Sequence, residues 1–139
     1  MKKLICYTLL LFVCSGMTSC GGDDHENGFG NKSLLIGSWA WIKEVWVEDG
    51  EQGSDVGGSS VEDIICFNED GTGYEGELHS GSLTYIWPFE YKFSGNTLII
   101  KYDDEDEYYL VNVIKLTSTQ LVLREEYGED YYDSYYVRF

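Results

Sequence analysis

The sequence is poor in positive charge and in proline. Nine lysines and arginines stand against 25 aspartates and glutamates in 139 residues, and there is one proline. All 25 acidic residues but only seven basic ones follow Cys20, so the chain after this point has a formal charge of 7 − 25 = −18. Such a charge repels nucleic acid and anionic membrane surfaces, which we exclude as partners. A solvated surface on an exported protein is the simpler explanation, and a preference for cationic partners or divalent ions is the alternative.

Long hydrophobic runs are missing too. The apolar stretch 4–14 follows Lys2 and Lys3 and is about half as long as the roughly 20 residues that a membrane-spanning helix needs. A basic start and a short apolar run predict a signal peptide over residues 1–19. The segment Met17-Thr18-Ser19-Cys20 resembles the lipobox of bacterial lipoproteins, which implies that Cys20 is lipidated and anchors the chain to a membrane. An ordinary signal peptide with an incidental cysteine is the alternative.

Apolar side chains are scarce in the segment that follows. Residues 20–33 therefore predict a lipidated cysteine and a flexible acidic tether. Asp23, Asp24 and Glu26 resemble the export tag that sends some Gram-negative lipoproteins to the outer face of the outer membrane. We expect an outer-membrane lipoprotein, at the cell surface rather than on the periplasmic face. Residues 34–139 are enough for one domain and too few for two.

A pair of cysteines is absent from that domain, because Cys66 is its one cysteine. An intramolecular disulfide is therefore excluded. In the apolar run 64–67, a small buried hydrophobe is the simplest role for Cys66. A nucleophilic cysteine needs a nearby base, and the two histidines, His25 and His79, lie in the tether and in a predicted turn.

Catalytic patterns are missing as well. No Ser-His-Asp order, phosphate loop or zinc-ligand spacing is present, and among 25 acids a pair at glycosidase distance would arise by chance. We expect no enzymatic activity, no catalytic residue, no metal and no cofactor. The acidic run 103–107 lacks the EF-hand order of ligands, so a solvated turn is expected there and calcium binding is left open.

The sequence does have apolar and polar residues alternating with period two from residue 39 onward, interrupted by turn residues. Glycine with Asn or Asp marks tight hairpins at 68–71 and 94–96. Eight strands are predicted, over residues 39–48, 61–68, 72–78, 83–93, 97–103, 107–116, 120–127 and 130–139.

The predicted fourth strand shows the alternation most clearly. Pro88 lacks a backbone N–H and should mark an edge or a bulge. Eight short strands without a covering helix favour an all-β fold, an antiparallel up-and-down barrel, because closure removes the edges. A two-sheet β-sandwich is the alternative. Six large side chains share one face of the fourth strand and require a core: Leu83, Tyr85, Trp87, Phe89, Tyr91 and Phe93.

Several short motifs resemble the lipocalin-like domains of bacterial lipoproteins. Gly37-Ser38-Trp39 resembles the G-x-W motif of lipocalins, and the order and spacing of later motifs are similar over nearly all of residues 34–139. The resemblance implies an eight-stranded barrel that Trp39 closes at one end. It also implies that Arg138, or alternatively Arg124, packs across the Trp39 ring as a cation–π pair. The paired cysteines of secreted lipocalins and their helix after the last strand are absent.

The resemblance also raises the question of a ligand. Residues 49–60, rich in glycine and serine, are expected to form a flexible lid over the open end, and a plain disordered loop is the alternative. A structural or interaction module, packed solid and contacting a protein or glycan partner, is the second hypothesis for the function. The first is a barrel that binds a small hydrophobic or aromatic ligand, with the inner wall formed by Trp41, Tyr74, Tyr85, Trp87, Phe89 and Tyr91.

Overall fold

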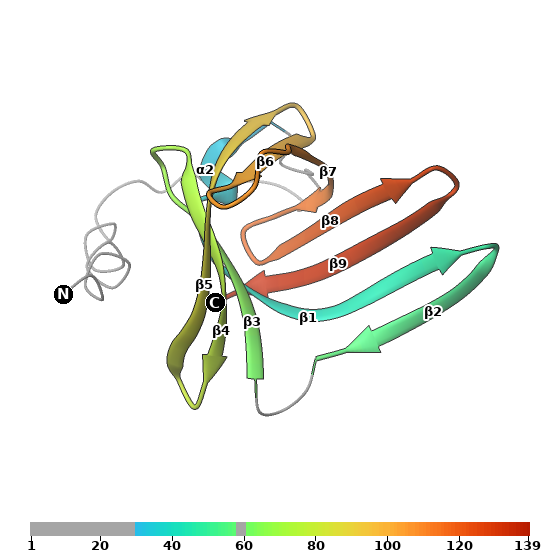
Figure 1. Cartoon of the computed structure of the whole chain (residues 1–139), viewed down its shortest axis with the longest axis horizontal. Helices are drawn as coiled ribbons and strands as arrows, with labels where there is room; N and C mark the ends of the chain where they lie inside the picture. The colour runs from blue at the N-terminus through green and yellow to red at the C-terminus, as the bar shows by residue number, and fades with distance from the viewer. Residues whose placement is uncertain (1–29, 58–60) are drawn as a thin grey trace, which may run out of the picture.

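In the computed structural model, one antiparallel sheet curls into a barrel (Figure 1). The structure describes residues 30–57 and 61–139, so the expected signal peptide, Cys20 and most of the expected tether lie outside the described residues. The elements within them are α2 (Lys32–Leu35), β1 (Gly37–Glu48), β2 (Glu51–Val56), β3 (Val61–Phe67), β4 (Thr72–His79), β5 (Ser82–Ser94), β6 (Thr97–Tyr102), β7 (Tyr109–Leu116), β8 (Gln120–Tyr127) and β9 (Asp130–Arg138).

Eight of the strands form a closed ring. Neighbours follow chain order from β3 to β9, and β1 closes the ring by pairing with both β3 and β9. The predicted eight-stranded antiparallel barrel is therefore confirmed, and the β-sandwich is excluded. The short helix α2 was not expected: it includes Lys32 and Ser33, which the sequence assigned to the tether. The Asn31 side chain accepts a hydrogen bond from the Ser33 N–H at 3.2 Å and so caps this helix.

Strand β2 lies within residues 49–60, where a flexible lid was expected, and for residues 51–56 that expectation is wrong. β1 and β2 form a hairpin with Glu48 opposite Glu51. Asp49 and Gly50 connect them with φ angles of +50° and +80°. A two-residue type I′ turn requires positive φ at both positions, and Asp-Gly is among its most favourable sequences. Residues 58–60 lie outside the described part of the chain.

The hydrophobic core fills the half of the barrel that the chain enters from α2, which we call the closed end. The opposite half, which carries the turns at Gly50, Gly81 and Gly128, is the open end. Three core rings meet at tilted or edge-on angles with centroids 5.1–6.3 Å apart, in an arrangement that adds about 0.5–1.5 kcal/mol per pair. These are Phe67, Phe89 and Tyr91. The buried cluster comprises Leu35, Trp39, Ile65, Phe67, Phe89, Tyr91, Leu98, Ile100, Val111, Val113, Leu116, Leu121 and Leu123.

The barrel wall is split at the open end. β1 pairs with β3 up to Ala40 and with β2 from Lys43 onward, and within the described residues β2 has β1 as its one partner. Figure 1 shows β8, β9, β1 and β2 extending as one arm, and β3, β4 and β5 as another. The ladder between β5 and β6 begins only at Phe89. Pro88 stands where this side of β5 becomes an edge, as predicted: its carbonyl accepts from the Asp103 N–H at 3.1 Å, and it has no N–H to return the bond.

Candidate functional site at the open end of the barrel

Trp39 and Arg138 seal the closed end. The Trp39 ring is fully buried, and its Nε1–H donates to the Leu35 carbonyl at 2.9 Å. The Arg138 guanidinium carbon lies 3.8 Å from the centroid of this ring. Its nitrogens donate to the carbonyls of Leu34 and Ile36 at 2.6 and 2.7 Å. The cation–π contact expected between Arg138 and Trp39 is present, so this end is packed and leaves no room for a ligand.

Arg124, the alternative partner of Trp39, lies elsewhere. Its guanidinium binds both carboxylate oxygens of Asp133, at 2.7 and 2.8 Å, and stacks on the Tyr131 ring. Arg124 and Asp133 are opposite one another on β8 and β9, on the face away from Leu123 and the core. This bidentate ion pair fixes the outer wall of the barrel.

The six aromatic residues expected in a ligand wall are not brought together. Phe89 and Tyr91 are buried in the core, where the Tyr91 hydroxyl donates to the Asn68 carbonyl at 2.6 Å and burial raises the pKa of Tyr91 to about 12. Tyr85 and Trp87 lie further along the same face of β5, at the open end, where their rings stack 6.1 Å apart and are 58% and 40% exposed.

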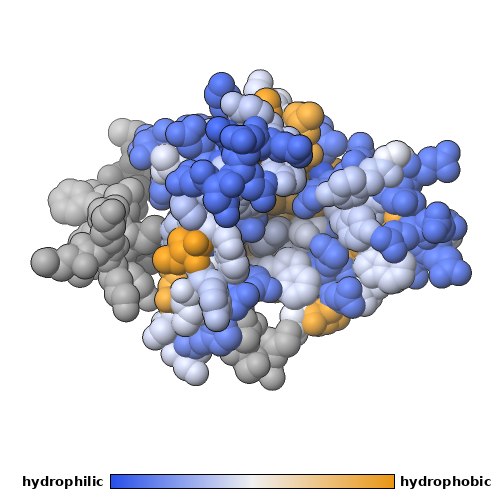
Figure 2. Space-filling model, in the orientation of Figure 1, coloured by the Kyte–Doolittle hydropathy of each residue, from blue (hydrophilic) through white to orange (hydrophobic). Residues whose placement is uncertain are grey.

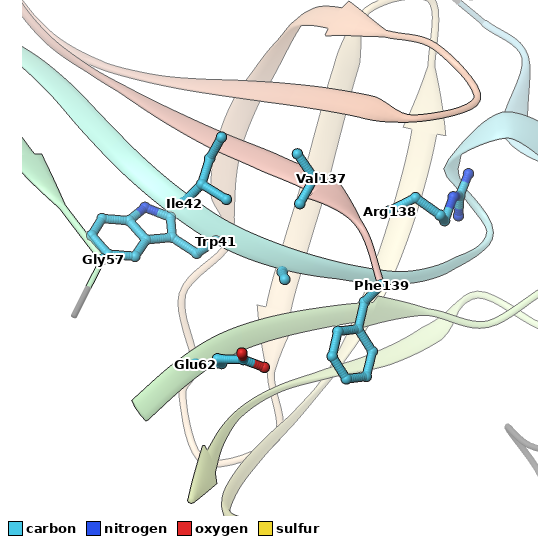
Figure 3. A pocket seen from close by; sticks show the side chains of 8 residues that line it. Trp41, Ile42, Gly57, Glu62, Val137, Arg138 and Phe139 are labelled. Carbon is cyan, nitrogen blue, oxygen red and sulfur yellow. The ribbon is translucent and has the colours of Figure 1, made fainter. Parts of the chain in front are cut away.

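Tyr74 and Trp41 are placed differently again. Tyr74 alternates with Gly73 and Glu75 on β4, which puts it on the outer face. Trp41 lines an outer groove of about 340 Å³ with Ala40 and Val137, which alternate with the buried Trp39 and with Arg138. In Figure 3, Trp41 lies towards Gly57, and Phe139 stands on the other side of the groove.

The inner wall of the open end carries carboxylates from four strands. The ladders place them on the inner face: Glu75 is opposite the core residue Ile65, and Glu125 follows the core residue Leu123 by two positions. His79 contacts Glu77 at 3.0 Å, whereas the other four have no ion-pair partner among the described residues. We call the five residues the inner carboxylates: Glu44 on β1, Asp63 on β3, Glu75 and Glu77 on β4, and Glu125 on β8.

Hydroxyl groups hold three of the inner carboxylates. The Tyr102 hydroxyl donates to Glu75 Oε1 and the Tyr127 hydroxyl to Glu125 Oε2, both at 2.7 Å. The Ser134 hydroxyl donates to Glu44 Oε2 at 3.1 Å. Such donors stabilise an ionised carboxylate and orient it, and they leave its negative charge uncompensated.

The inner carboxylates are close enough to affect one another. Burial raises the pKa of Glu75, the Tyr102 hydrogen bond opposes this shift, and the negative charges of Glu125 and Asp63 add to it. Burial and then the charge of Glu75 raise the pKa of the Tyr136 phenol, with smaller effects from Glu125 and Glu44. Carboxylates from β1, β4 and β8 therefore surround one space beside the Tyr136 ring.

A cavity of about 410 Å³ opens in this half of the barrel. The volume lies within the range of roughly 300–1,000 Å³ that is usual for small-molecule sites. Figure 2 shows mostly hydrophilic side chains on the visible face, including the arm of β8 and β9, with isolated hydrophobic patches. The cavity is lined by two inner carboxylates, a further carboxylate and two tyrosine rings: Glu44, Glu125, Asp130, Tyr127 and Tyr132.

The described part of the chain carries no metal cluster, no exposed thiol and no membrane-spanning helix. In residues 30–57 and 61–139, no three His, Cys, Asp or Glu side chains group so as to hold a metal ion, and this range includes the acidic turn 103–107. Cys66 is 1% exposed, and its sulfur accepts a hydrogen bond from the Ser38 hydroxyl at 3.5 Å. No helix in the described ranges has the length and apolar character needed to span a bilayer.

Comparison with known proteins identifies the family. A model of the lipocalin-like domain matches residues 35–123, which is more than half of the 139-residue chain. The chain belongs to the lipocalin-like domain family. The crystal structure of a lipocalin-like protein from Bacteroides uniformis ATCC 8492 matches this chain with a TM-score of 0.57 and 19% identity, covering 76% of this chain and 99% of that one. A comparison with curated proteins finds no match.

The family match ends before much of the open-end cavity of this lipocalin-like barrel. Of the five residues that line the cavity, Glu125, Tyr127, Asp130 and Tyr132 follow residue 123. The sequence pattern did not indicate them, because the aromatic wall was expected on the first, third and fourth predicted strands, whereas these four residues lie on β8 and β9. The available signal was the alternation in β8, where Glu125 and Tyr127 continue the face that begins with buried Leu121.

Proposed function

We propose that the chain is a lipoprotein anchored through acylated Cys20, and that its lipocalin-like barrel binds a small ligand in the open-end cavity without catalysis. The single observation that carries the binding function is the cavity of about 410 Å³ in the half of the barrel opposite the packed core. Tyr127 and Tyr132 at the cavity, and the stacked Tyr85 and Trp87 on β5, offer aromatic surface to an apolar or aromatic group.

Binding is tested on the full-length protein in detergent with three matched probes: 4-phenylbutylamine, 4-phenyl-1-butanol and 4-phenylbutyrate. We expect saturable binding of at least one probe. Tryptophan fluorescence and calorimetry measure this binding. A Trp46→Leu variant should lose most of the fluorescence response, because Trp46 lies opposite the cavity-lining Tyr132 in the ladder between β1 and β9. Trp41→Leu is the matched control, since Trp41 lines the outer groove. Absence of saturable binding for all three probes would reject the carrier function.

The anchor is tested by metabolic labelling of cells with a clickable fatty acid. Wild type and a Cys66→Ala control should take up label, and Cys20→Ala should not, because Cys20 is the cysteine expected to be acylated. Protease treatment of intact cells then separates the proposed surface location in the outer membrane from the periplasmic face. Label on Cys20→Ala would disprove the lipobox.

A structural or interaction module is the second candidate, and the packing of Phe89 and Tyr91 in the core favours it. In that case the rings stabilise the barrel and a protein or glycan binds its surface. The same probe titration distinguishes the two candidates, because a module of this kind binds none of the three small molecules.

A further inference from the structure

The charge balance of the open-end cavity narrows the class of ligand. Glu44 and Glu125 line the cavity with Asp130, and among the described residues none of the three has a cationic partner within ion-pair distance. All seven lysines and arginines after Cys20 are engaged at the closed end or lie on the outer face: Lys32 on the Glu69 carbonyl, Lys43 over Tyr135, Lys101 over Tyr108, Arg124 on Asp133, Arg138 on Trp39, and Lys92 and Lys115 exposed.

We infer that the open-end cavity selects a positively charged organic ligand, namely an amine or ammonium ion that also carries an apolar or aromatic group. The inference rests on the proposed function and specifies its ligand. Tyr127 and Tyr132 line the cavity together with the carboxylates, and the negative faces of aromatic rings attract cations. Carboxylates and aromatic rings together form the environment in which organic ammonium ions are bound.

A bare metal ion fits this cavity less well than an organic cation. The three carboxylates that line the cavity come from three different strands, β1, β8 and β9, and no group of three His, Cys, Asp or Glu side chains in the described chain is arranged for a metal. Tyrosine and serine hydroxyls already occupy one oxygen each of Glu75, Glu125 and Glu44. Dispersed negative charge of this kind matches a cation whose charge sits on an extended molecule.

Neutral and anionic ligands would be disfavoured for electrostatic reasons. A neutral ligand that displaces water from the cavity leaves the charges of Glu125 and Glu44 desolvated and without a counter-charge, which is unfavourable. An anion adds repulsion from the same groups. An ammonium group supplies the missing positive charge, and its contact with a carboxylate is a charge-assisted hydrogen bond.

The three matched probes test this inference separately from the proposed function, because they share a phenylbutyl group and differ in charge. We expect full-length protein to bind 4-phenylbutylamine at least about tenfold more tightly than 4-phenyl-1-butanol, and 4-phenylbutyrate more weakly than either. Affinity for the amine should fall as salt is raised, because salt screens the attraction. Equal affinity for amine and alcohol would overturn the cationic preference and leave the proposed function intact. If none of the three probes binds, both the cationic preference and the proposed function are rejected.

A matched pair of variants tests whether the carboxylates of the cavity, and not the general surface charge, attract the amine. Glu125 faces the cavity, whereas the adjacent Glu126 on β8 faces outward, opposite Tyr131 and near Arg124. Glu125→Gln should weaken binding of the amine about tenfold and leave binding of the alcohol unchanged. Glu126→Gln has the same net charge and should bind the amine like wild type. Equal losses in the two variants would show that general surface charge attracts the amine, and would overturn the assignment to the cavity. Thermal unfolding of both variants checks that each is folded.

Discussion

At the closed end of the barrel Trp39 is fully buried beneath Arg138, whereas at the open end Trp87 is 40% exposed beside Glu75. The same ring of strands thus carries an apolar interior at one end and an acidic, hydroxyl-rich interior at the other. Stability and ligand binding are therefore expected to depend on different residues. Substitutions matched between the two ends test this separation.

The largest expected effect is the loss of the closed-end tryptophan. Trp39→Ala removes a fully buried ring and should lower the free energy of unfolding by about 3–5 kcal/mol. Trp87→Ala, at the open end, should lower it by only about 1–2 kcal/mol, because the side chain is 40% exposed. Urea unfolding followed by circular dichroism measures both. Equal losses would mean that the open end contributes to the core as much as the closed end does.

Glycines at the two ends provide a second comparison. Gly37 has φ +122°, and a Cβ there would lie 2.6 Å from an Arg138 nitrogen that is held by the Ile36 carbonyl. Gly81 has φ +76° with nothing within 4 Å of the added atom. Gly37→Ala should therefore destabilise by about 2–3 kcal/mol, and Gly81→Ala by about 1 kcal/mol. Denaturant unfolding should show this order. The reverse order would rule out Arg138 as the steric constraint.

Glu75→Gln should stabilise the protein at neutral pH, by up to about 1 kcal/mol. The pKa of Glu75 is raised above its ordinary value of 4.5, chiefly by burial, so the ionised carboxylate opposes folding. Wild type therefore loses stability as the pH rises from the unfolded value through the raised pKa of the folded state, and the glutamine variant does not. At pH 8 the variant should have a larger free energy of unfolding than wild type, and the difference between the two should shrink near pH 4. A variant that is less stable at pH 8 would contradict this sign.

The smallest expected effect on global stability is at the β1–β2 turn. Gly50→Ala strains a residue with φ +80°, and β2 pairs with β1 alone among the described strands. The loss should stay below about 1 kcal/mol and appear as faster amide hydrogen exchange in Glu51–Val56, with exchange of the core strands unchanged. Faster exchange throughout β1 and β9 would show that β2 supports the ring.

Much of the ring could be predicted from local sequence because a barrel of hairpins requires only period-two alternation and suitable turn residues. Both the burial of Trp39 and the position of Pro88 at an edge follow from those rules. β2 was missed because glycine and serine in its neighbourhood outweighed the Asp49-Gly50 turn signal. Gly53 itself has a structural reason within β2, since a Cβ there would overlap the Trp46 ring.

The candidate site was harder to predict. Alternation shows which face of a strand a residue lies on, but it does not show how near that residue is to the closed or the open end of the barrel. Phe89 and Trp87 share one face of β5, yet the first is buried in the core and the second is exposed at the open end. On β4 the rule that apolar residues face inward selected Tyr74, whereas Glu75 occupies the interior. Interior carboxylates depend on hydroxyl partners such as Tyr102, which lies 27 residues away in sequence.

Arg138 joins the last strand to the carbonyls of Leu34 and Ile36, so the chain enters the barrel from α2 on the sealed side. Under the proposal that Cys20 is lipidated, the chain would join the barrel at the closed end, so the tether would not have to cross the open-end cavity. A ligand would then reach the cavity on the side of the barrel away from the segment that joins it to the tether.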